Sequence, residues 1–260
     1  MATFFGEVIL PTSRVFFDDY DDSDNEEEYQ VERTLEVKLL DENSLKHEFE
    51  LLIVVEGIVC RGFADLYLVN ANTSRLAEFR LPVEVERDNL VEITSHKEEA
   101  SVLYKLNNKT LLLRTSPAID IFMSHQLTLK VIPWIERCKN IMTFHSKSVC
   151  DYRCEVREDL PPTFERTLVT SAVKNIPPGL RYLDQPNFIT GFSASVAGWC
   201  ECKDKPCILH IIFTDNSSLD SITFAPLFKI FETSNVKHLI VNKPDSSKLG
   251  ISCDQSYMYM

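Results

Sequence analysis

Two groups of cysteines have the residue type for metal binding but not the spacing. Cys150 and Cys154 form one group, and Cys200, Cys202 and Cys207 form the other. A structural zinc site usually takes two C-x2-4-C pairs, or one such pair with two closely spaced histidines. Neither spacing repeats here, and Cys200 and Cys202 face different ways on a helix. We therefore expect unligated thiols and no cofactor, with a cysteine-ligated zinc module as an alternative.

Nucleophilic and phosphate chemistry find little support in the sequence. Gly191-Phe-Ser-Ala-Ser195 begins like a G-x-S-x-G elbow, but Ser195 replaces the second glycine and the stretch lies within a predicted helix. The seven glycines form neither GxxxxGK[ST] nor GxGxxG. His210 and His238 fall in or beside predicted strands, where structural histidines are expected. The sequence therefore contains no constellation that we interpret as catalytic.

The last three residues, Met258, Tyr259 and Met260, form a hydrophobic–Tyr–any-residue ending. A tyrosine can fill an apolar slot while its hydroxyl finds a polar partner. A terminal carboxylate can pair with a lysine at the floor of a pocket. We expect Tyr259 to fill a slot on another protein, Met258 to support it, and the Met260 carboxylate to act as the charged anchor.

The net charge of −12 is concentrated in one stretch. Residues 18–32 hold nine carboxylates and neither Lys nor Arg, so this stretch carries −9 and leaves −3 for the remaining residues. Like charges repel and few of these side chains can be buried, so a disordered segment is predicted. The nearly neutral remainder has no basic face for nucleic acid or an anionic membrane.

The composition is typical of a globular cytosolic protein, with 44% hydrophobic and 25% charged residues. Residues 1–7 have neither a basic n-region nor an apolar h-region, so secretion is not expected. No apolar run approaches the roughly 18 residues of a membrane helix. We therefore expect reduced thiols and a cytoplasmic location, with nuclear or endoplasmic-reticulum-associated pools as further possibilities.

Strand patterns dominate the first half of the chain. Residues 35–40 alternate at first, and residues 49–55 form a nearly continuous apolar run typical of a strand covered on both faces. Asn107-Asn-Lys is a plausible hairpin turn between two further strands. The other predicted strands cover residues 64–69, 102–106, 111–115, 141–144, 149–156, 207–213 and 238–241.

Helical periodicity appears in three places. Apolar positions from 127 to 138 are interrupted by Pro133, and residues 224–231 repeat apolar side chains at helical spacing. Asn187 is expected to cap a third helix, whose stripe is Phe188, Phe192, Val196 and Trp199. A short helix-like stretch is also expected between Leu160-Pro-Pro and Ile176-Pro-Pro-Gly.

Alternation of strands and helices in the last third predicts one α/β domain, with a mainly parallel sheet and helices packed on it. The expected organisation is an N-terminal segment (1–17), the acidic disordered segment (18–33), the α/β domain (34–250) and a C-terminal tail (251–260).

Several stretches share their type, order and spacing with a known family. They are residues 1–8 with the acidic segment behind them, Leu183-Asp-Gln-Pro-Asn187, Thr214-Asp215, the stretch 222–227, and the ending Met258-Tyr259-Met260. Together they resemble the proteasome assembly chaperone 1 family of animals.

The resemblance implies a nucleoside-phosphorylase-like α/β sandwich without the catalytic apparatus of the enzymes. It implies a heterodimer with proteasome assembly chaperone 2, which binds the outer face of the α-subunit ring of the 20S proteasome. That dimer would promote α-ring formation and block off-pathway ring dimers and premature activators. The tail would enter a pocket between α subunits. A phosphorylase-like nucleoside-binding enzyme is the alternative function.

Overall fold

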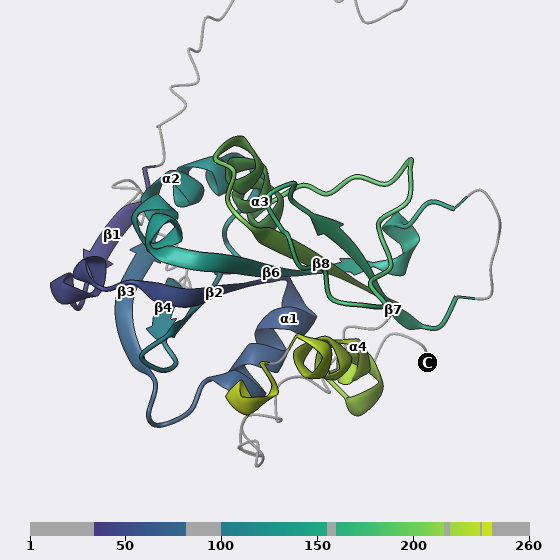
Figure 1. Ribbon diagram of the computed structural model, residues 1–260, viewed down its shortest axis with the longest axis horizontal. Coiled ribbons are helices and arrows are strands. Elements are labelled where there is room, and N and C mark those ends of the chain that lie inside the picture. Colours follow the sequence, from purple (N-terminus) through teal and green to yellow (C-terminus); the bar gives the residue numbers. More distant parts are fainter. Residues whose placement is uncertain (1–33, 82–99, 155–159, 216–218, 235, 241–260) are drawn as a thin grey trace, which may run out of the picture. The chain divides into compact units, whose positions relative to one another are not determined.

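An eight-stranded mixed sheet runs through the part of the chain that the computed structural model describes, which is residues 34–81, 100–154, 160–215, 219–234 and 236–240. The strand order is β1-β3-β4-β5-β2-β6-β8-β7 (Figure 1). The strands are β1 (Glu36–Leu39), β2 (Phe49–Glu56), β3 (Ser74–Arg80), β4 (Ser101–Lys105), β5 (Thr110–Arg114), β6 (Cys138–Ser148), β7 (Thr163–Val169) and β8 (Cys207–Thr214).

The centre of the sheet is parallel and its margins are antiparallel. β2 pairs in parallel with β5 and β6, and β6 pairs in parallel with β8. The pairs β1–β3, β3–β4, β4–β5 and β7–β8 are antiparallel. The expected α/β class with helices packed on a sheet is confirmed, and the sheet is mixed because hairpins extend a parallel centre.

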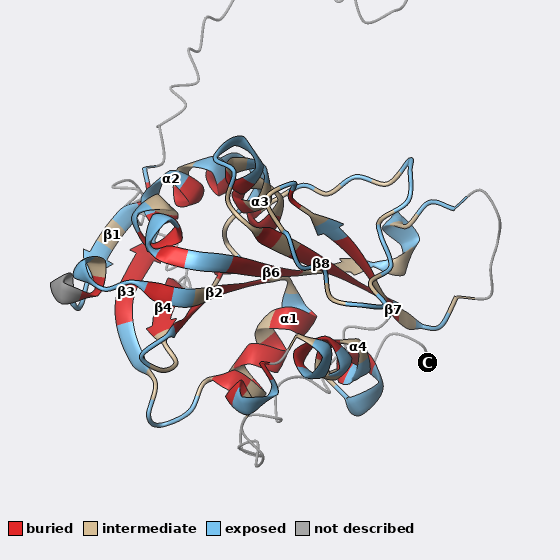
Figure 2. Cartoon of the chain, viewed as in Figure 1, coloured by how far each residue is buried: buried red, intermediate tan, exposed pale blue. Residues whose placement is uncertain are grey.

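Helices cover both faces of the parallel centre. α2 (Ile121–Arg137) and α3 (Phe192–Cys202) lie on one face, and α1 (Ile58–Phe63) and α4 (Ser221–Thr233) lie on the other (Figure 1). Figure 2 shows buried residues in the strands between them: β2 and β8 are buried over most of their length, and β6 is buried mainly over residues 141–144. Burial on both faces explains why β2 reads as an unbroken apolar run.

Side chains that lie outside α2 cap both of its ends. The Asp120 side chain accepts a 2.7 Å hydrogen bond from the backbone N–H of Met123, which caps the N-terminus. At the other end, the Lys205 ammonium donates to the carbonyls of Ile135, Glu136 and Cys138, at 2.9, 2.6 and 2.7 Å. The helix continues through Pro133.

The strand predicted for residues 64–69 is wrong. These residues continue α1 as a π-helical turn, Ala64–Leu68. The buried side chains Val59, Cys60, Phe63 and Ala64 recur at helical spacing and face the aromatic side of α4. The run Leu66-Tyr-Leu-Val has strand propensity, but packing against α4 determines its conformation.

Two strands were not predicted. β3 lies in a stretch for which no element was expected, and β7 takes the place of the expected helical stretch between the two proline pairs. Two charged residues, Glu165 and Arg166, interrupt the apolar pattern of β7, and both have partners within the fold. The Arg166 guanidinium lies over the rings of Tyr152 and Phe164, and Glu165 contacts His210 at 2.6 Å. The strand predicted for residues 149–156 is wrong within the described residues, because β6 ends at Ser148 and a 3-10 turn, Val149–Asp151, follows.

Two boundaries near the C-terminal end also differ from expectation. α3 begins at Phe192 with Gly191 as its N-cap, and Asn187 instead donates its side-chain amide to the carbonyls of Arg153 and Asp184. His238 lies in a 3-10 turn, Lys237–Leu239, rather than in a strand. The acidic segment and the tail lie outside the described residues.

Candidate functional site

The carboxyl edge of the parallel strands is where open α/β folds usually bind ligands. In this chain β2 ends there in Glu56, and Gly57 follows with a positive φ of 85°. α3 begins at the same edge, so its first backbone N–H groups point towards the end of β2. A helix N-terminus in this position is well suited to hold a phosphate or another anion.

Glu56 itself provides that anion. Its carboxylate accepts hydrogen bonds from the backbone N–H of Phe192 at 3.0 Å and of Ser193 at 2.7 Å. The Nδ1 atom of His145, from β6, lies 2.9 Å from the same carboxylate, and both side chains are largely buried. The N-terminus of α3 is therefore occupied by a side chain of the protein itself.

The contact between Glu56 and the start of α3 is close, and it determines the charge of the carboxylate. Gly191 has a φ of 93°, and a Cβ built on it would lie 2.6 Å from Oε1 of Glu56. Burial would raise the pKa of Glu56, but the contact with His145 and the Ser193 N–H outweighs burial, and the pKa lies below its ordinary value. Glu56 is thus a carboxylate held ionised in a structural position.

The cysteines were expected to be unligated, with a zinc module as the alternative. Among the described residues no group of three or more His, Cys, Asp or Glu side chains is arranged to hold a metal ion. Cys150, Cys154 and Cys202 are exposed, whereas Cys200 and Cys207 are buried between α3 and β8. The hydrogen bond with Cys200 and burial raise the pKa of Cys207, which keeps this thiol protonated.

His210 and Ser195 make contacts that stabilise the fold. His210 is fully buried, stacks on Phe144 and contacts the Glu165 carboxylate with Nδ1. Ser195 lies inside α3, where its hydroxyl accepts a 2.9 Å hydrogen bond from Thr128 of α2. His238 lies at the rim of a pocket, described next.

A cavity of about 620 Å³ opens at the opposite, amino-terminal edge of the parallel strands. α4 ends at Thr233, and the pocket is lined by residues near the amino-terminal ends of β2, β6 and β8. Leu51, Met142 and Ile208 line the floor from these three strands. Val173 and Pro177 line it from the loop after β7, and Val236 from the turn after α4.

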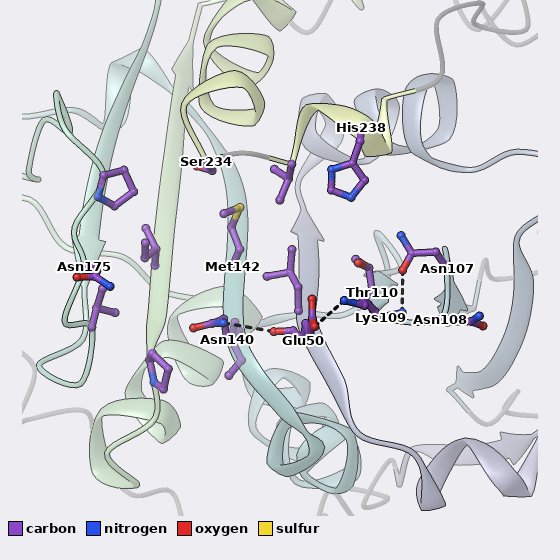
Figure 3. A pocket seen from close by; sticks show the side chains of 17 residues that line it. Glu50, Asn107, Asn108, Lys109, Thr110, Asn140, Met142, Asn175, Ser234 and His238 are labelled. Atoms are coloured by element: carbon purple, nitrogen blue, oxygen red, sulfur yellow. Dashed lines mark hydrogen bonds and ion pairs between the residues drawn. The ribbon is translucent and has the colours of Figure 1, made fainter.

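Amide side chains surround this apolar floor. Figure 3 shows Asn175 on one side of the pocket, Asn107 and Asn108 on the opposite side, and His238 facing Glu50 across the remaining width. The charged lining residues are paired, since the Lys109 ammonium donates to the Glu50 carboxylate at 2.9 Å and lowers the pKa of Glu50. The lining thus combines an apolar floor with neutral hydrogen-bonding groups.

Neither the Glu56 contact nor the pocket was predicted from the sequence. The Glu56 contact had one signal, a carboxylate that ends a buried apolar run immediately before a glycine. The pocket had none, because its lining comes from loops and strand ends far apart in the sequence. The predicted binding residues Met258, Tyr259 and Met260 lie outside the described residues. Among the described helices, none is long and apolar enough to cross a membrane.

Comparison with known proteins places the chain in a family. The family model PAC1, described as Proteasome assembly chaperone 4, matches residues 1–254. Proteasome assembly chaperone 1 of Homo sapiens is 28% identical over 272 residues, which cover 95% of this chain and 94% of that protein. The protein of the same name from Danio rerio is 28% identical over 242 residues, covering 85% of this chain and 86% of that protein.

The fold has solved counterparts. The crystal structure of Pyrococcus furiosus PbaB, an archaeal proteasome activator, matches with a TM-score of 0.53 at 12% identity, covering 78% of this chain and 90% of that chain. At this identity the likeness concerns the fold alone. The family match extends over nearly the whole sequence and agrees with the resemblance seen in its motifs. The chain belongs to the PAC1 family of proteasome assembly chaperones.

Proposed function

We propose that this chain acts in 20S proteasome assembly as one half of a heterodimer with proteasome assembly chaperone 2. The dimer binds the outer face of the α-subunit ring, promotes ring formation and blocks off-pathway ring dimers. Membership of a family of non-enzymatic assembly factors carries this proposal, since the family model matches residues 1–254. The filled N-terminus of α3 supports it, because Glu56 occupies the place where a phosphorylase-like enzyme could bind an anion.

The docking element in this proposal is the ending Met258-Tyr259-Met260. Tyr259 enters an apolar slot between α subunits, Met258 packs beside it, and the Met260 carboxylate pairs with a lysine of the slot. The pattern of residue types supports this role. A tyrosine gives a large apolar contact at a low entropic cost, and a charge-assisted hydrogen bond fixes the end of the segment.

Affinity purification followed by mass spectrometry tests both parts of the proposal. The full chain should recover α subunits and proteasome assembly chaperone 2. A chain in which Met258, Tyr259 and Met260 are all replaced by serine should lose α subunits and retain the partner chaperone. Recovery of α subunits undiminished in that variant would refute tail docking, and absence of the partner from both samples would refute the heterodimer.

A further inference from the structure

The pocket at the amino-terminal edge of the sheet lies beside the last described residues of the chain. We propose that it is a resting site for the chain's own C-terminal segment, residues 241–260, and that it takes the aromatic and methionine side chains of Tyr257, Met258 and Tyr259. This inference rests on the proposed function, because a tail held in the pocket is not available to dock on the α ring.

The position at which the described chain ends supports this occupant. Val236 and His238 line the pocket, and Ile240 is the last described residue. The segment 241–260 therefore starts beside the pocket. Residues 241–256 can span up to about 50 Å when extended, so reach does not limit the contact. A tethered segment of this length meets the pocket at an effective concentration on the order of millimolar, so even weak affinity gives substantial occupancy.

The chemistry of the lining matches that of the segment. Leu51, Met142 and Ile208 form an apolar floor, and methionine sulfur makes favourable contacts with aromatic rings. The rim amides of Asn108 and Asn175 can both donate to and accept from peptide groups. Asn107 accepts from the backbone N–H of Lys109 and Asn140 donates to the carbonyl of Glu50, so these two offer their other amide atom. A short extended peptide with aromatic side chains uses both features. Its side chains enter the floor and its backbone pairs with the rim.

Charge argues against a phosphate-bearing ligand. The ammonium of Lys109 donates to the Glu50 carboxylate at 2.9 Å. The positive charge of Lys109 in the described lining is therefore balanced by a negative one, which does not favour a phosphate. The volume of about 620 Å³ lies within the range of small-molecule and short-peptide sites. The stretch Leu249–Met260 contains a single charged side chain, Asp254, which suits a neutral pocket.

Occupancy of this pocket would compete with docking on the α ring. A tail held against its own sheet cannot enter a slot on another protein, so the apparent affinity for α subunits falls by the fraction of tails that are held. Blocking the pocket should therefore strengthen binding to α subunits without any change in the tail.

Photo-crosslinking within the full chain tests the contact directly. With p-benzoylphenylalanine in place of Tyr257, irradiation should give cross-links within one chain to Met142, to residues 173–177 and to residues 236–238. Asn175→Trp, which places a large ring at the pocket mouth, should abolish these cross-links. Lys174→Trp adds the same ring at an exposed neighbour that does not line the pocket and should retain them. Cross-links that avoid the pocket, or that join two copies of the chain, would overturn the proposal.

Binding to α subunits separates this inference from the function on which it rests. Asn175→Trp should bind α subunits severalfold more tightly than Lys174→Trp, and equal binding would overturn the competition. If the chain that keeps Asn175 gives no pocket cross-links but still binds α subunits through its tail, self-docking alone is refuted. Pocket cross-links in a chain whose α-subunit binding ignores Tyr259→Ala would support self-docking and refute α-ring docking by the tail.

Discussion

The carboxylate of Glu56, at the end of β2, accepts a 2.7 Å hydrogen bond from the backbone N–H of Ser193, in the first turn of α3. These residues lie 137 positions apart in the sequence. The contact joins the central strand to a helix on the α2 side of the sheet and places negative charge at the positive end of the α3 dipole. It thereby stabilises the fold at the edge where related architectures keep their ligands.

Replacing Glu56 by alanine should lower the free energy of unfolding by about 2–4 kcal/mol, because two backbone N–H groups lose their acceptor in a buried place. Urea unfolding of the purified chain measures this loss. Glu56→Gln keeps one acceptor oxygen and should lose less. Glu232→Ala removes an exposed pair with Lys237 and should leave the midpoint unchanged. Equal midpoints for Glu56→Ala and Glu232→Ala would contradict the role of the contact.

Gly191→Ala should destabilise the chain more than Gly179→Ala. Both glycines have positive φ, 93° and 82°, so alanine is strained by about 1–2 kcal/mol at either position. A Cβ at position 191 would also meet Glu56 Oε1 at 2.6 Å, whereas nothing lies within 4 Å of a Cβ at position 179. The additional loss at position 191, about 1–3 kcal/mol, should appear in the same unfolding measurement. Identical losses at the two positions would show that no close approach exists there.

The stabilising effect of Glu56 should depend on pH in a defined direction. Its pKa in the folded chain lies below the ordinary value of 4.5, since His145 and the Ser193 N–H favour the ionised form despite burial. The carboxylate therefore contributes its full stability above pH 4.5 and loses it as the pH falls through the folded-state pKa. The difference in unfolding free energy between wild type and Glu56→Gln should shrink under acid. A difference that grows on acidification would contradict this assignment.

Lys205→Met should destabilise the chain by about 1–3 kcal/mol, because the ammonium satisfies three carbonyl groups at the C-terminal end of α2. Thermal unfolding should show the midpoint falling by several degrees for a chain of this size. Lys203→Met is the matched control, since Lys203 is exposed and stands two positions away. A control that is as unstable as Lys205→Met would assign the loss to the loop rather than to the cap.

β3 (Ser74–Arg80) was not predicted from the sequence. Other buried strands could be predicted because burial on both faces leaves a continuous apolar run. β2 and β8 were identified in this way, and the hairpin between β4 and β5 was identified from its asparagine turn. β7 was missed because Glu165 and Arg166 break its pattern, and both are compensated by partners that only the fold brings close. Those partners are His210 for the carboxylate and the Tyr152 and Phe164 rings for the guanidinium.

The site residues also differ in whether neighbouring residues in the sequence suffice to predict them. A local pattern suffices to suggest Tyr259 as a docking group, since the residue types stand next to one another. Neither the Glu56 contact nor the pocket at the amino-terminal edge of the sheet can be predicted locally, because each is assembled from strand ends and loops that the sheet order brings together. The residue that begins α3 is a similar case. Asn187 is a good capping residue by type, but the Glu56 carboxylate fixes the first turn at Phe192.

The most direct test of the proposed function is the affinity of the purified heterodimer for α-subunit assembly intermediates. Tyr259→Ala should weaken binding by at least about tenfold, since a buried aromatic anchor commonly contributes 2 kcal/mol or more. Gln255→Ala, in the same segment but outside the docking element, should bind like the wild type, and both variants should retain the partner chaperone. Equal affinities for Tyr259→Ala and Gln255→Ala would contradict the proposal that this chain docks on the α ring through its C-terminal tyrosine.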